Sequence, residues 1–431
     1  MITIEQLHEK FKRCNGACTD TRAISSDSMF FALKGPNFNA NVFASAALEA
    51  GARFAVVDDP TVALDDRFLL VENVLAALQD VARFHRRRCN IPVLGITGSN
   101  GKTTTKELIN AVLAARYRTL ATIGNLNNHI GVPLTLLRLT DEDEMAIIEM
   151  GANKPGDIAE LAHIAEPTHG LITNIGRAHL QGFGGPEGVL RTKTELFAFV
   201  KAHHGKLFVN ADDAVLMEKA NGIGRVSYGT DAMADIRGAV TSTDAFLGLT
   251  FVGSDGRTRT VRTKLVGDYN FPNAMAAIAC GREFGVDDDL IVEALEAYEP
   301  GNNRSQFKDT GRNQLILDAY NANPSSMAAA IRNFSSMSSD REKLLILGDM
   351  LELGASANAE HRAIAQLVDE LELDTIFVGP LFRHALGSHP SSSFEDASTL
   401  LTALTNSPVT GKLILLKGSR GTKLETVVPV L

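Results

Sequence analysis

The chain has 431 residues and a mass of 46.3 kDa, a length that predicts two or three domains. Apolar residues make up 45% and charged residues 22%, which is typical of a folded globular protein and leaves little room for extended disorder. A net charge of -9 and an isoelectric point near 5.7 exclude a general attraction to phosphate backbones or anionic lipid, so nucleic acid is not an expected partner.

The start of the chain gives no sign of export. Its first ten residues, MITIEQLHEK, lack an apolar signal core, and no stretch approaches the roughly 18 apolar residues that span a bilayer. We therefore expect a cytoplasmic protein without membrane insertion. The four cysteines are too few and too scattered for a disulfide scaffold, and Cys14 and Cys18 have no second pair to complete a zinc site. All four are expected to be reduced thiols.

Residues 1–82 have the mixed pattern of a small α/β domain. Short apolar runs and helical stretches alternate there, at 29–33, 44–50, 54–57 and 74–88. The last of these helical stretches ends in Arg86-Arg87-Arg88. We interpret these arginines as cations that complement a helix dipole rather than as an anion-binding patch.

Two further α/β regions follow. In residues 83–301 apolar runs at 92–97, 145–149 and 170–175 alternate with helical periods such as 102–115, which predicts a parallel sheet wrapped by helices. The turn-rich segment 299–303 is the best linker candidate. Residues 302–431 repeat the alternation, with apolar runs at 344–347, 375–378 and 412–416 and a helix around 364–371. We therefore predict three domains, the last of them Rossmann-like.

The strongest chemical signal is the segment 95–105, GITGSNGKTTT, which lies between an expected strand and an expected helix. Glycines let backbone N–H groups curl around phosphate oxygens, and the helix N-terminus adds partial positive charge. We expect Lys102 to reach the β- and γ-phosphates of a nucleotide and Thr103 to ligate Mg²⁺. Ile96 stands where the standard phosphate loop has its first glycine. The other nucleotide-binding residues expected here are Gly98, Ser99, Asn100, Gly101 and Thr104.

A phosphate loop alone fits a kinase, a GTPase-like switch, a transport ATPase or a ligase. Further motifs together with this loop resemble the Mur ligases, which are ATP-dependent amide-bond-forming enzymes of peptidoglycan precursor synthesis. These motifs are EMGAN at 149–153, NIGRAH at 174–179 and Arg304 after the linker. Three other stretches are similar to the branch that adds D-Ala-D-Ala: YNANP at 320–324, LGDMLELG at 347–354 and KGSR at 417–420.

The resemblance implies a central phosphate-loop domain flanked by a small N-terminal α/β domain and a C-terminal ligase domain. It also implies a reaction in which the carboxylate of UDP-MurNAc-tripeptide attacks the γ-phosphate of ATP to give an acyl phosphate. The amine of D-Ala-D-Ala then displaces phosphate. ATP and two Mg²⁺ ions are the implied cofactors, with Lys102 and Arg304 neutralising the developing charge. We expect the enzyme to act as a monomer.

The same resemblance implies three Mg²⁺-binding groups besides Thr103. Glu149 closes an apolar run, where parallel sheets place site residues. His179 would be a second ligand, although an isolated histidine is more often structural. Lys193 matches the family's lysine that reacts with CO2 to form a carbamate, whose anionic oxygens suit Mg²⁺. The neighbouring Arg191 cannot undergo this reaction.

Other roles are implied for asparagines and charged residues. Asn270 and Asn273 lie one helical turn apart and would contact adenine, although they also fit an ordinary capped helix. Arg304 would contact the γ-phosphate and Asp318 the ribose, both from beyond the linker. Their use of ATP therefore requires domain closure.

Substrate contacts are implied in all three domains. Thr21, Arg22 and Lys34 resemble the uridine-nucleotide region, with Thr21 in place of the family's usual serine. The implied contacts to the diphosphate and the muramyl peptide are Asn125, Asn127 and Asn128. Asn321 and Asn323 in the last domain are further implied substrate-binding residues.

Two alternatives stay open. A sister ligase on the same scaffold, such as a folylpolyglutamate or amino-acid-adding enzyme, would share the phosphate loop and the metal residues. A nucleotide-switched binding protein of the GTPase type would need an Asn-Lys-x-Asp motif that recognises guanine. The candidate segment Asn153-Lys154-Pro155-Gly156 ends in glycine instead.

Overall fold

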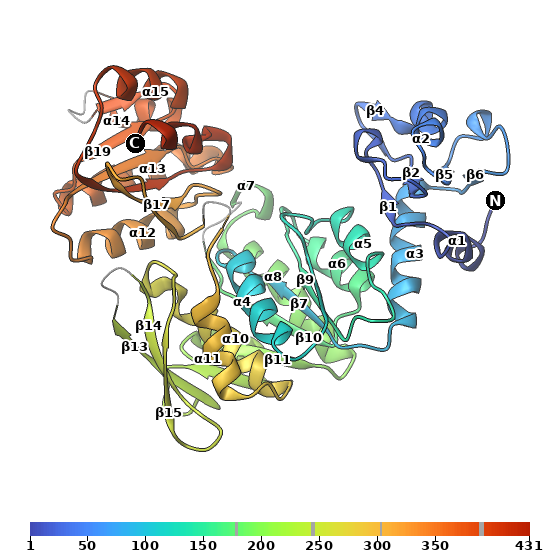
Figure 1. Ribbon diagram of the computed structural model, residues 1–431, viewed down its shortest axis with the longest axis horizontal. Coiled ribbons are helices and arrows are strands. Elements are labelled where there is room, and N and C mark those ends of the chain that lie inside the picture. Colours follow the sequence, from blue (N-terminus) through green and yellow to red (C-terminus); the bar gives the residue numbers. More distant parts are fainter. Residues whose placement is uncertain (177–179, 243–245, 302–303, 388–391) are drawn as a thin grey trace.

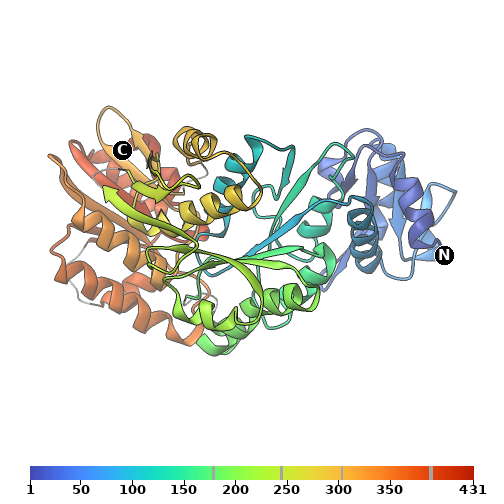
Figure 2. The same cartoon turned by 90° about the horizontal axis from the view of Figure 1, so that it is seen from below.

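The computed structural model describes residues 1–176, 180–242, 246–301, 304–387 and 392–431. It contains three α/β units, and the N-terminal and C-terminal units lie at opposite ends of an elongated molecule with the largest sheet between them (Figures 1 and 2). Among the described residues, no helix combines the length and the apolar character that a membrane crossing requires. The predicted fold class, α/β with a central parallel sheet and two flanking α/β units, is confirmed.

The N-terminal unit is built on a four-stranded parallel sheet in the order β1-β2-β5-β6. Its first helix begins at a capping box, in which Thr3 and Gln6 satisfy each other's backbone N–H groups. The strands are β1 (Ala17–Cys18), β2 (Met29–Phe31), β5 (Phe54–Val57) and β6 (Phe68–Leu70), with a hairpin of β3 (Lys34–Gly35) and β4 (Phe38–Asn39). The helices are α1 (Ile4–Phe11) and α2 (Ala44–Glu49), and the short 3-10 turns are η1 (Thr21–Ala23), η2 (Ala40–Phe43) and η3 (Pro60–Val62).

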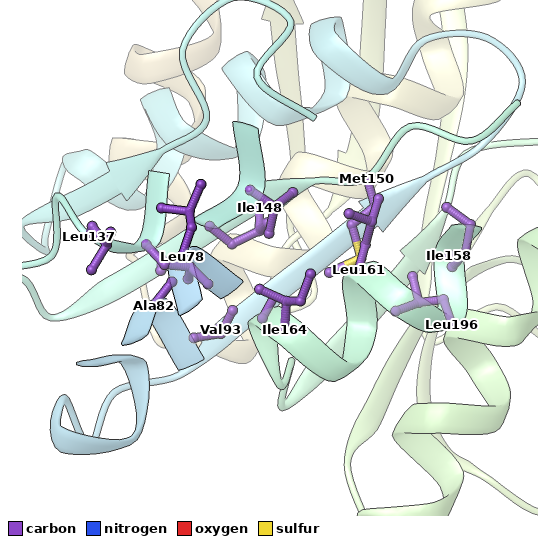
Figure 3. Packing of buried hydrophobic residues seen from close by; sticks show 14 of the residues in the cluster. Leu78, Ala82, Val93, Leu137, Ile148, Met150, Ile158, Leu161, Ile164 and Leu196 are labelled. Atoms are coloured by element: carbon purple, nitrogen blue, oxygen red, sulfur yellow. The ribbon is translucent and has the colours of Figure 1, made fainter. Parts of the chain in front are cut away.

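Helix α3 (Val74–Arg88) connects this unit to the large sheet. It has the bounds expected from the sequence, and it crosses the boundary expected between residues 82 and 83. Its buried face packs against α1 on one side and against α5 and α6 on the other. Figure 3 shows Leu78 and Ala82 of this helix beside Val93 and Ile148 of the large sheet. The position of the first domain boundary stays a prediction.

The large sheet has nine strands in the order β15-β14-β13-β12-β11-β10-β7-β9-β8, of which β13, β14 and β15 pair antiparallel. Successive residues of β7 face opposite cores: Val93 belongs to the buried cluster that includes residues of α6 and α8, whereas Leu94 belongs to the one that includes residues of α4 and α10. Both faces are therefore covered, as parallel strands require.

The strands of the large sheet are β7 (Val93–Thr97), β8 (Thr119–Ala121), β9 (Met145–Glu149), β10 (His169–Ile172), β11 (Lys206–Asn210), β12 (Gly224–Gly229), β13 (Ile236–Ser242), β14 (Gly248–Val252) and β15 (Thr258–Arg262). Its helices are α4 (Lys102–Ala114), α5 (Gly131–Leu136), α6 (Asp157–Ala165), α7 (Leu180–Phe183), α8 (Pro186–Ala202), α9 (Ala214–Lys219), α10 (Phe271–Glu283) and α11 (Asp288–Ala297), with the turn η4 (Asp268–Asn270).

The C-terminal unit is a six-stranded sheet in the order β16-β17-β21-β18-β19-β20, parallel except for β16. Its strands are β16 (Gln306–Asp309), β17 (Gln314–Asp318), β18 (Glu342–Gly348), β19 (Thr375–Val378), β20 (Ser392–Phe394) and β21 (Lys412–Lys417). The helices are α12 (Pro324–Ser336), α13 (Ala357–Glu370), α14 (Pro380–Leu386) and α15 (Ala397–Asn406), with turns η5 (Gly354–Ser356), η6 (Arg420–Thr422) and η7 (Leu424–Val430).

Candidate active site

A cleft of about 1080 Å³ lies between the large sheet and the C-terminal sheet. The large sheet contributes the phosphate loop after β7 and Glu149 at the end of β9. The C-terminal sheet contributes Asp318 and Lys417, the last residues of β17 and β21. The carboxyl ends of parallel strands in both sheets therefore face one cleft, the position where open α/β sheets bind ligands.

The phosphate loop has a backbone that depends on glycine. Gly98 and Gly101 have φ angles of 146° and 76°. A Cβ atom on Gly98 would lie 1.9 Å from Thr173 Oγ1, and one on Gly101 would lie 2.7 Å from Asn273 Oδ1. The segment that follows β10 supports the loop, because the side chain of Asn174 accepts from Asn100 N at 3.0 Å and donates to Asn100 O at 3.0 Å. Residues 99–104 line the cleft, and their binding of phosphate stays a prediction.

Lys102 is the first residue of α4, and its side chain curls back over the loop. Its Nζ donates to Gly98 O at 2.8 Å and to Ser99 O at 3.3 Å. Desolvation lowers the pKa of Lys102, the Glu149 carboxylate opposes this effect, and Arg304 adds to it. The ammonium group therefore lies where the loop would hold the phosphates of a nucleotide.

Thr103 and Glu149 form the candidate metal site. Thr103 Oγ1 donates to Glu149 Oε2 at 2.8 Å, and Asn127 Nδ2 donates to Glu149 Oε1 at 2.7 Å. Glu149 is only 2% exposed. Within the described ranges no three His, Cys, Asp or Glu side chains converge on one point. A hydroxyl and one carboxylate beside a phosphate loop nevertheless fit Mg²⁺, because this ion prefers oxygen ligands and usually binds through one or two carboxylates plus substrate phosphates.

Of the other two predicted metal groups, His179 lies outside the described residues. Lys193 is buried within α8, 2% exposed, with its Nζ 5.6 Å from the centre of the Phe183 ring. Burial lowers the pKa of Lys193 to about 7, and the positive charge of Lys102 contributes. An appreciable fraction of the amine is therefore uncharged at neutral pH. Arg191, on the same helix, is exposed.

Asn270 and Asn273 line the cleft but are 2% and 6% exposed. Their amides form a chain of hydrogen bonds. Thr105 Oγ1 donates to Asn273 Oδ1 at 3.0 Å, and Asn273 Nδ2 donates to Asn270 Oδ1 at 2.9 Å. Asn270 Nδ2 then donates to Ser305 Oγ at 3.1 Å. This chain connects α4 with the start of the C-terminal unit, and the proposed contact with adenine stays a prediction.

Residues beyond the linker reach the same cleft. The Arg304 guanidinium lies 3.7 Å from the centre of the Tyr320 ring, and Arg420 lies 5.6 Å from it. Asp318 Oδ2 pairs with the buried Lys417 Nζ at 2.5 Å. Asn323 Nδ2 donates to Asn100 Oδ1 of the phosphate loop at 2.7 Å. The structure therefore brings Arg304 and Asp318 to the cleft that the phosphate loop lines, and their contacts with ATP stay predictions.

The residues expected to bind substrate fall into two groups. One group lines the cleft: Asn125, Asn127, Asn128, Asn321 and Asn323. The other group lies in the N-terminal unit, where Arg22 pairs with Asp20 at 2.7 Å and Lys34 pairs with Asp58 at 2.7 Å. Thr21, Arg22 and Lys34 are not brought to the cleft. Their contact with a uridine nucleotide stays a prediction.

Several cleft residues were not assigned roles from the sequence, and three of them are aromatic or cationic. Tyr320, Lys417 and Arg420 all stand in stretches that carry the resemblance, so a signal was present, but only the fold shows that two arginines lie against the Tyr320 ring. Two buried residues behind the site, Lys106 and Thr122, gave no signal at all. A charged helix residue and a threonine after a short strand are ordinary in local sequence.

Comparison with known proteins agrees with this geometry. Residues 96–281 match the model of the Mur ligase middle domain, and residues 303–420 match that of the Mur ligase, glutamate ligase domain. The UDP-N-acetylmuramoyl-tripeptide–D-alanyl-D-alanine ligase of Bacillus subtilis is 34% identical over 426 residues, which cover 96% of this chain and 92% of the relative.

Solved structures give the same result. A crystal structure of MurF from Acinetobacter baumannii matches with a TM-score of 0.87 and 31% identity, over 99% of this chain and 98% of that one. The MurF ligase of Thermotoga maritima in complex with ADP matches with a TM-score of 0.85 and 26% identity, over 96% of both chains. Since the relatives match the N-terminal unit, the large sheet and the C-terminal unit together, the chain belongs to the Mur ligase family.

Proposed function

We propose that this chain joins D-Ala-D-Ala to UDP-MurNAc-tripeptide, with conversion of ATP to ADP and phosphate. The observation that carries the proposal is the shared cleft, in which the phosphate-loop Lys102 and Glu149 face Arg304 and Tyr320 of the C-terminal unit. The names of the relatives identify the two substrates. The enzyme is an ATP-dependent peptide-bond-forming ligase, and the nucleotide-linked substrate and ATP make the cytoplasm its proposed location.

The chemistry explains why two sheets must share one cleft. A carboxylate resists attack by an amine because its oxygen is a poor leaving group. The tripeptide carboxylate attacks the γ-phosphorus of ATP, the bond to ADP breaks, and an acyl phosphate forms. The amine of D-Ala-D-Ala then attacks the carbonyl carbon, loses a proton, and inorganic phosphate leaves with the C–O bonding pair. Each step develops negative charge on phosphate oxygens, which Lys102 and Arg304 would neutralise.

Thr103 and Glu149 would hold Mg²⁺, which when bound offsets the charge of the nucleotide phosphates. The protein positions these two groups through the hydrogen bonds from Thr103 and Asn127 to the Glu149 carboxylate. We further propose that Lys193 becomes carbamylated and serves a second Mg²⁺. Its buried amine supports this, since the uncharged form is the nucleophile that adds to CO2.

Coupled phosphate release tests the proposed function. We expect release with ATP, Mg²⁺ and UDP-MurNAc-tripeptide to depend on D-Ala-D-Ala, with a product whose mass equals that of the pentapeptide. Lys102→Ala should lower the rate by about 10²–10³-fold, the usual cost of removing one group that stabilises developing charge. It should leave binding of the UDP-substrate intact. Lys206→Ala, on β11 and paired with Glu283, is the control. Turnover that is indifferent to D-Ala-D-Ala, or tight binding of GTP instead of ATP, contradicts the proposal.

Chemical rescue tests the carbamate. Lys193→Ala should lose activity by orders of magnitude with folding preserved, and a short carboxylate such as acetate or formate should restore part of it by occupying the vacated space. Arg191→Ala should show neither the loss nor the rescue. Activity of Lys193→Ala near that of the unchanged protein in bicarbonate-free buffer would remove Lys193 from the site.

A further inference from the structure

Lys106 is a buried lysine that the proposed chemistry does not use. It lies on α4, one turn after Thr103, and is 1% exposed. Its Nζ donates to Thr122 O at 2.5 Å and pairs with Glu107 Oε1 at 2.7 Å. Burying an ammonium group is costly unless it is paired and hydrogen-bonded, so these two contacts account for its tolerance in the interior. Of these two partners, Thr122 is the one that is also hydrogen-bonded to Glu149.

Thr122 connects Lys106 to Glu149. It follows β8 directly and is 1% exposed. Its N–H donates to Ile147 O at 3.0 Å, and its Oγ1 accepts from Glu149 N at 3.0 Å. With the bond from Lys106, all three polar groups of Thr122 are engaged. The residue therefore fixes the backbone of Glu149 relative to α4.

Helix α4 thus holds Glu149 in two ways. Thr103 and Lys106 are three residues apart, so they project from the same side of the helix. Thr103 holds the carboxylate directly at 2.8 Å, whereas Lys106 holds the backbone through Thr122. The segment after Thr122 carries Asn127, which holds the other carboxylate oxygen at 2.7 Å. Loss of the hydrogen bonds of Thr122 would therefore free both the backbone of Glu149 and the start of the segment that carries Asn127.

We propose that Lys106 is a positioning residue, which acts through Thr122 to keep Glu149 in register with the phosphate loop for binding of the Mg²⁺–nucleotide complex. The inference rests on the proposed function only in taking a Mg²⁺-bound nucleotide as the ligand. Groups that orient a metal ligand from behind typically contribute 10–100-fold to metal affinity or activity. A shift of 1 Å in a positioned group is enough for an effect of this size.

Calorimetric binding of ADP, with Mg²⁺ and with a chelator, tests the inference without turnover. Lys106→Met keeps the length of the side chain and removes the charge. Thr122→Val keeps the shape and removes the acceptor for Glu149 N, whereas Thr122→Ser keeps that acceptor. We expect Lys106→Met and Thr122→Val each to reduce the Mg²⁺-dependent gain in ADP affinity by about ten-fold, the lower end of the range for such groups. In the presence of the chelator, Mg²⁺-free ADP should bind all these variants equally, because the glycine-containing phosphate loop is unchanged.

The double variant supplies the decisive comparison. If Lys106 acts through Thr122, Lys106→Met with Thr122→Val should lose no more than the larger single loss. Thr122→Ser should bind like the unchanged protein, as should the control Lys206→Met. The inference would be overturned if the fold-losses in ADP affinity of the two single variants multiplied in the double variant, or if the losses were equal with and without Mg²⁺. Should Lys106→Met fail to fold, the contrast between Thr122→Val and Thr122→Ser still decides. Absence of D-Ala-D-Ala-dependent turnover in the unchanged protein would refute the proposed function and leave this binding test intact.

Discussion

One face of the N-terminal sheet shares an apolar core with the large sheet and its other face has a core of its own, whereas both cores of the C-terminal sheet are its own. Leu7 and Phe11 of α1 belong to the same buried cluster as Val93 and Ile148 of the large sheet. Among the described residues, the two C-terminal clusters include a single residue from before the linker, Val266. One end of the molecule is therefore joined to the middle by apolar burial and the other mainly by polar contacts.

The polar joint is the one at the cleft. It includes the hydrogen bond from Asn323 to Asn100 and the bond from Asn270 to Ser305. A hydrogen bond exchanged with water contributes only about 0.5–1.5 kcal/mol net, whereas full burial of one large apolar side chain contributes about 1.5–3 kcal/mol. A polar joint can therefore open and close at small cost, which suits a cleft that must admit two substrates and exclude water from an acyl phosphate.

The largest expected effect concerns the apolar joint. Leu78→Ala on α3 removes a fully buried side chain from the shared core and should lower the free energy of unfolding by about 2–5 kcal/mol. Calorimetry should show the transitions of the N-terminal unit and the large sheet falling together. Phe334→Ala in a C-terminal core should lower only the transition of the C-terminal unit. A separate early transition of the N-terminal unit in Leu78→Ala would contradict the idea of one shared core.

Acid should weaken the same joint. His8 on α1 is 1% exposed, and its Nε2 lies 2.9 Å from His85 Nδ1 on α3. His85 Nε2 donates to Leu139 O at 2.8 Å, since a carbonyl oxygen only accepts, and a neutral His85 ring then accepts from His8 Nε2 at its Nδ1. His8 Nδ1 has no hydrogen-bond partner among the described residues. A proton added there would be buried and unpaired.

Burial, His85, Arg88 and Lys12 lower the pKa of His8 to about 4, against a weak opposing effect of Glu9. Between pH 6.5 and 4 the unfolded chain therefore binds more protons than the folded one, and this contribution to stability is lost as the pH falls. At about 1.4 kcal/mol per pH unit the loss amounts to at most about 3.5 kcal/mol. Denaturant titrations at pH 7 and pH 4 should show a smaller difference for His8→Gln, which can still donate to His85. An identical pH dependence in this variant would remove His8 from the joint.

The two joints also differ in how far the sequence predicts them. Helix α3 and strand β9 have the bounds expected from their apolar periods, because their buried faces leave a strong pattern. The strands β13, β14 and β15 were not foreseen. Their antiparallel pairing leaves alternate residues exposed, as in β15, so no continuous apolar run marks them.

In the site, motifs carried the prediction of the phosphate loop, Glu149 and Arg304, because each needs a particular residue type at a fixed position. The network behind them could not be predicted in this way. The bond between Lys106 and Thr122 depends on which strand end α4 covers, a tertiary relation that one sequence does not contain. The burial of Lys193 is similar, since its segment has the composition of a solvated helix face.

The smallest expected effect tests the polar joint itself. Asn323 has two functions: its Oδ1 caps α12 by accepting from Ser326 N at 2.9 Å, and its Nδ2 donates to Asn100 Oδ1. Asn323→Ser keeps a good N-cap and removes only the amide that reaches the phosphate loop. We therefore expect a change in stability within about 0.5 kcal/mol and a rise in the KM for ATP of up to about ten-fold, the equivalent of one hydrogen bond.

Small-angle scattering should show the unchanged protein becoming more compact with an ATP analogue and UDP-substrate, and Asn323→Ser needing more nucleotide to reach the same compaction. The KM values of Asn323→Ser also distinguish two roles for this asparagine. A rise in the KM for D-Ala-D-Ala with an unchanged KM for ATP would assign Asn323 to the substrate, as the family resemblance implies, instead of to the joint. Equal compaction of both proteins at equal nucleotide concentration would show that the C-terminal sheet does not depend on this bond to close, and would leave the bond from Asn270 to Ser305 to hold the polar joint.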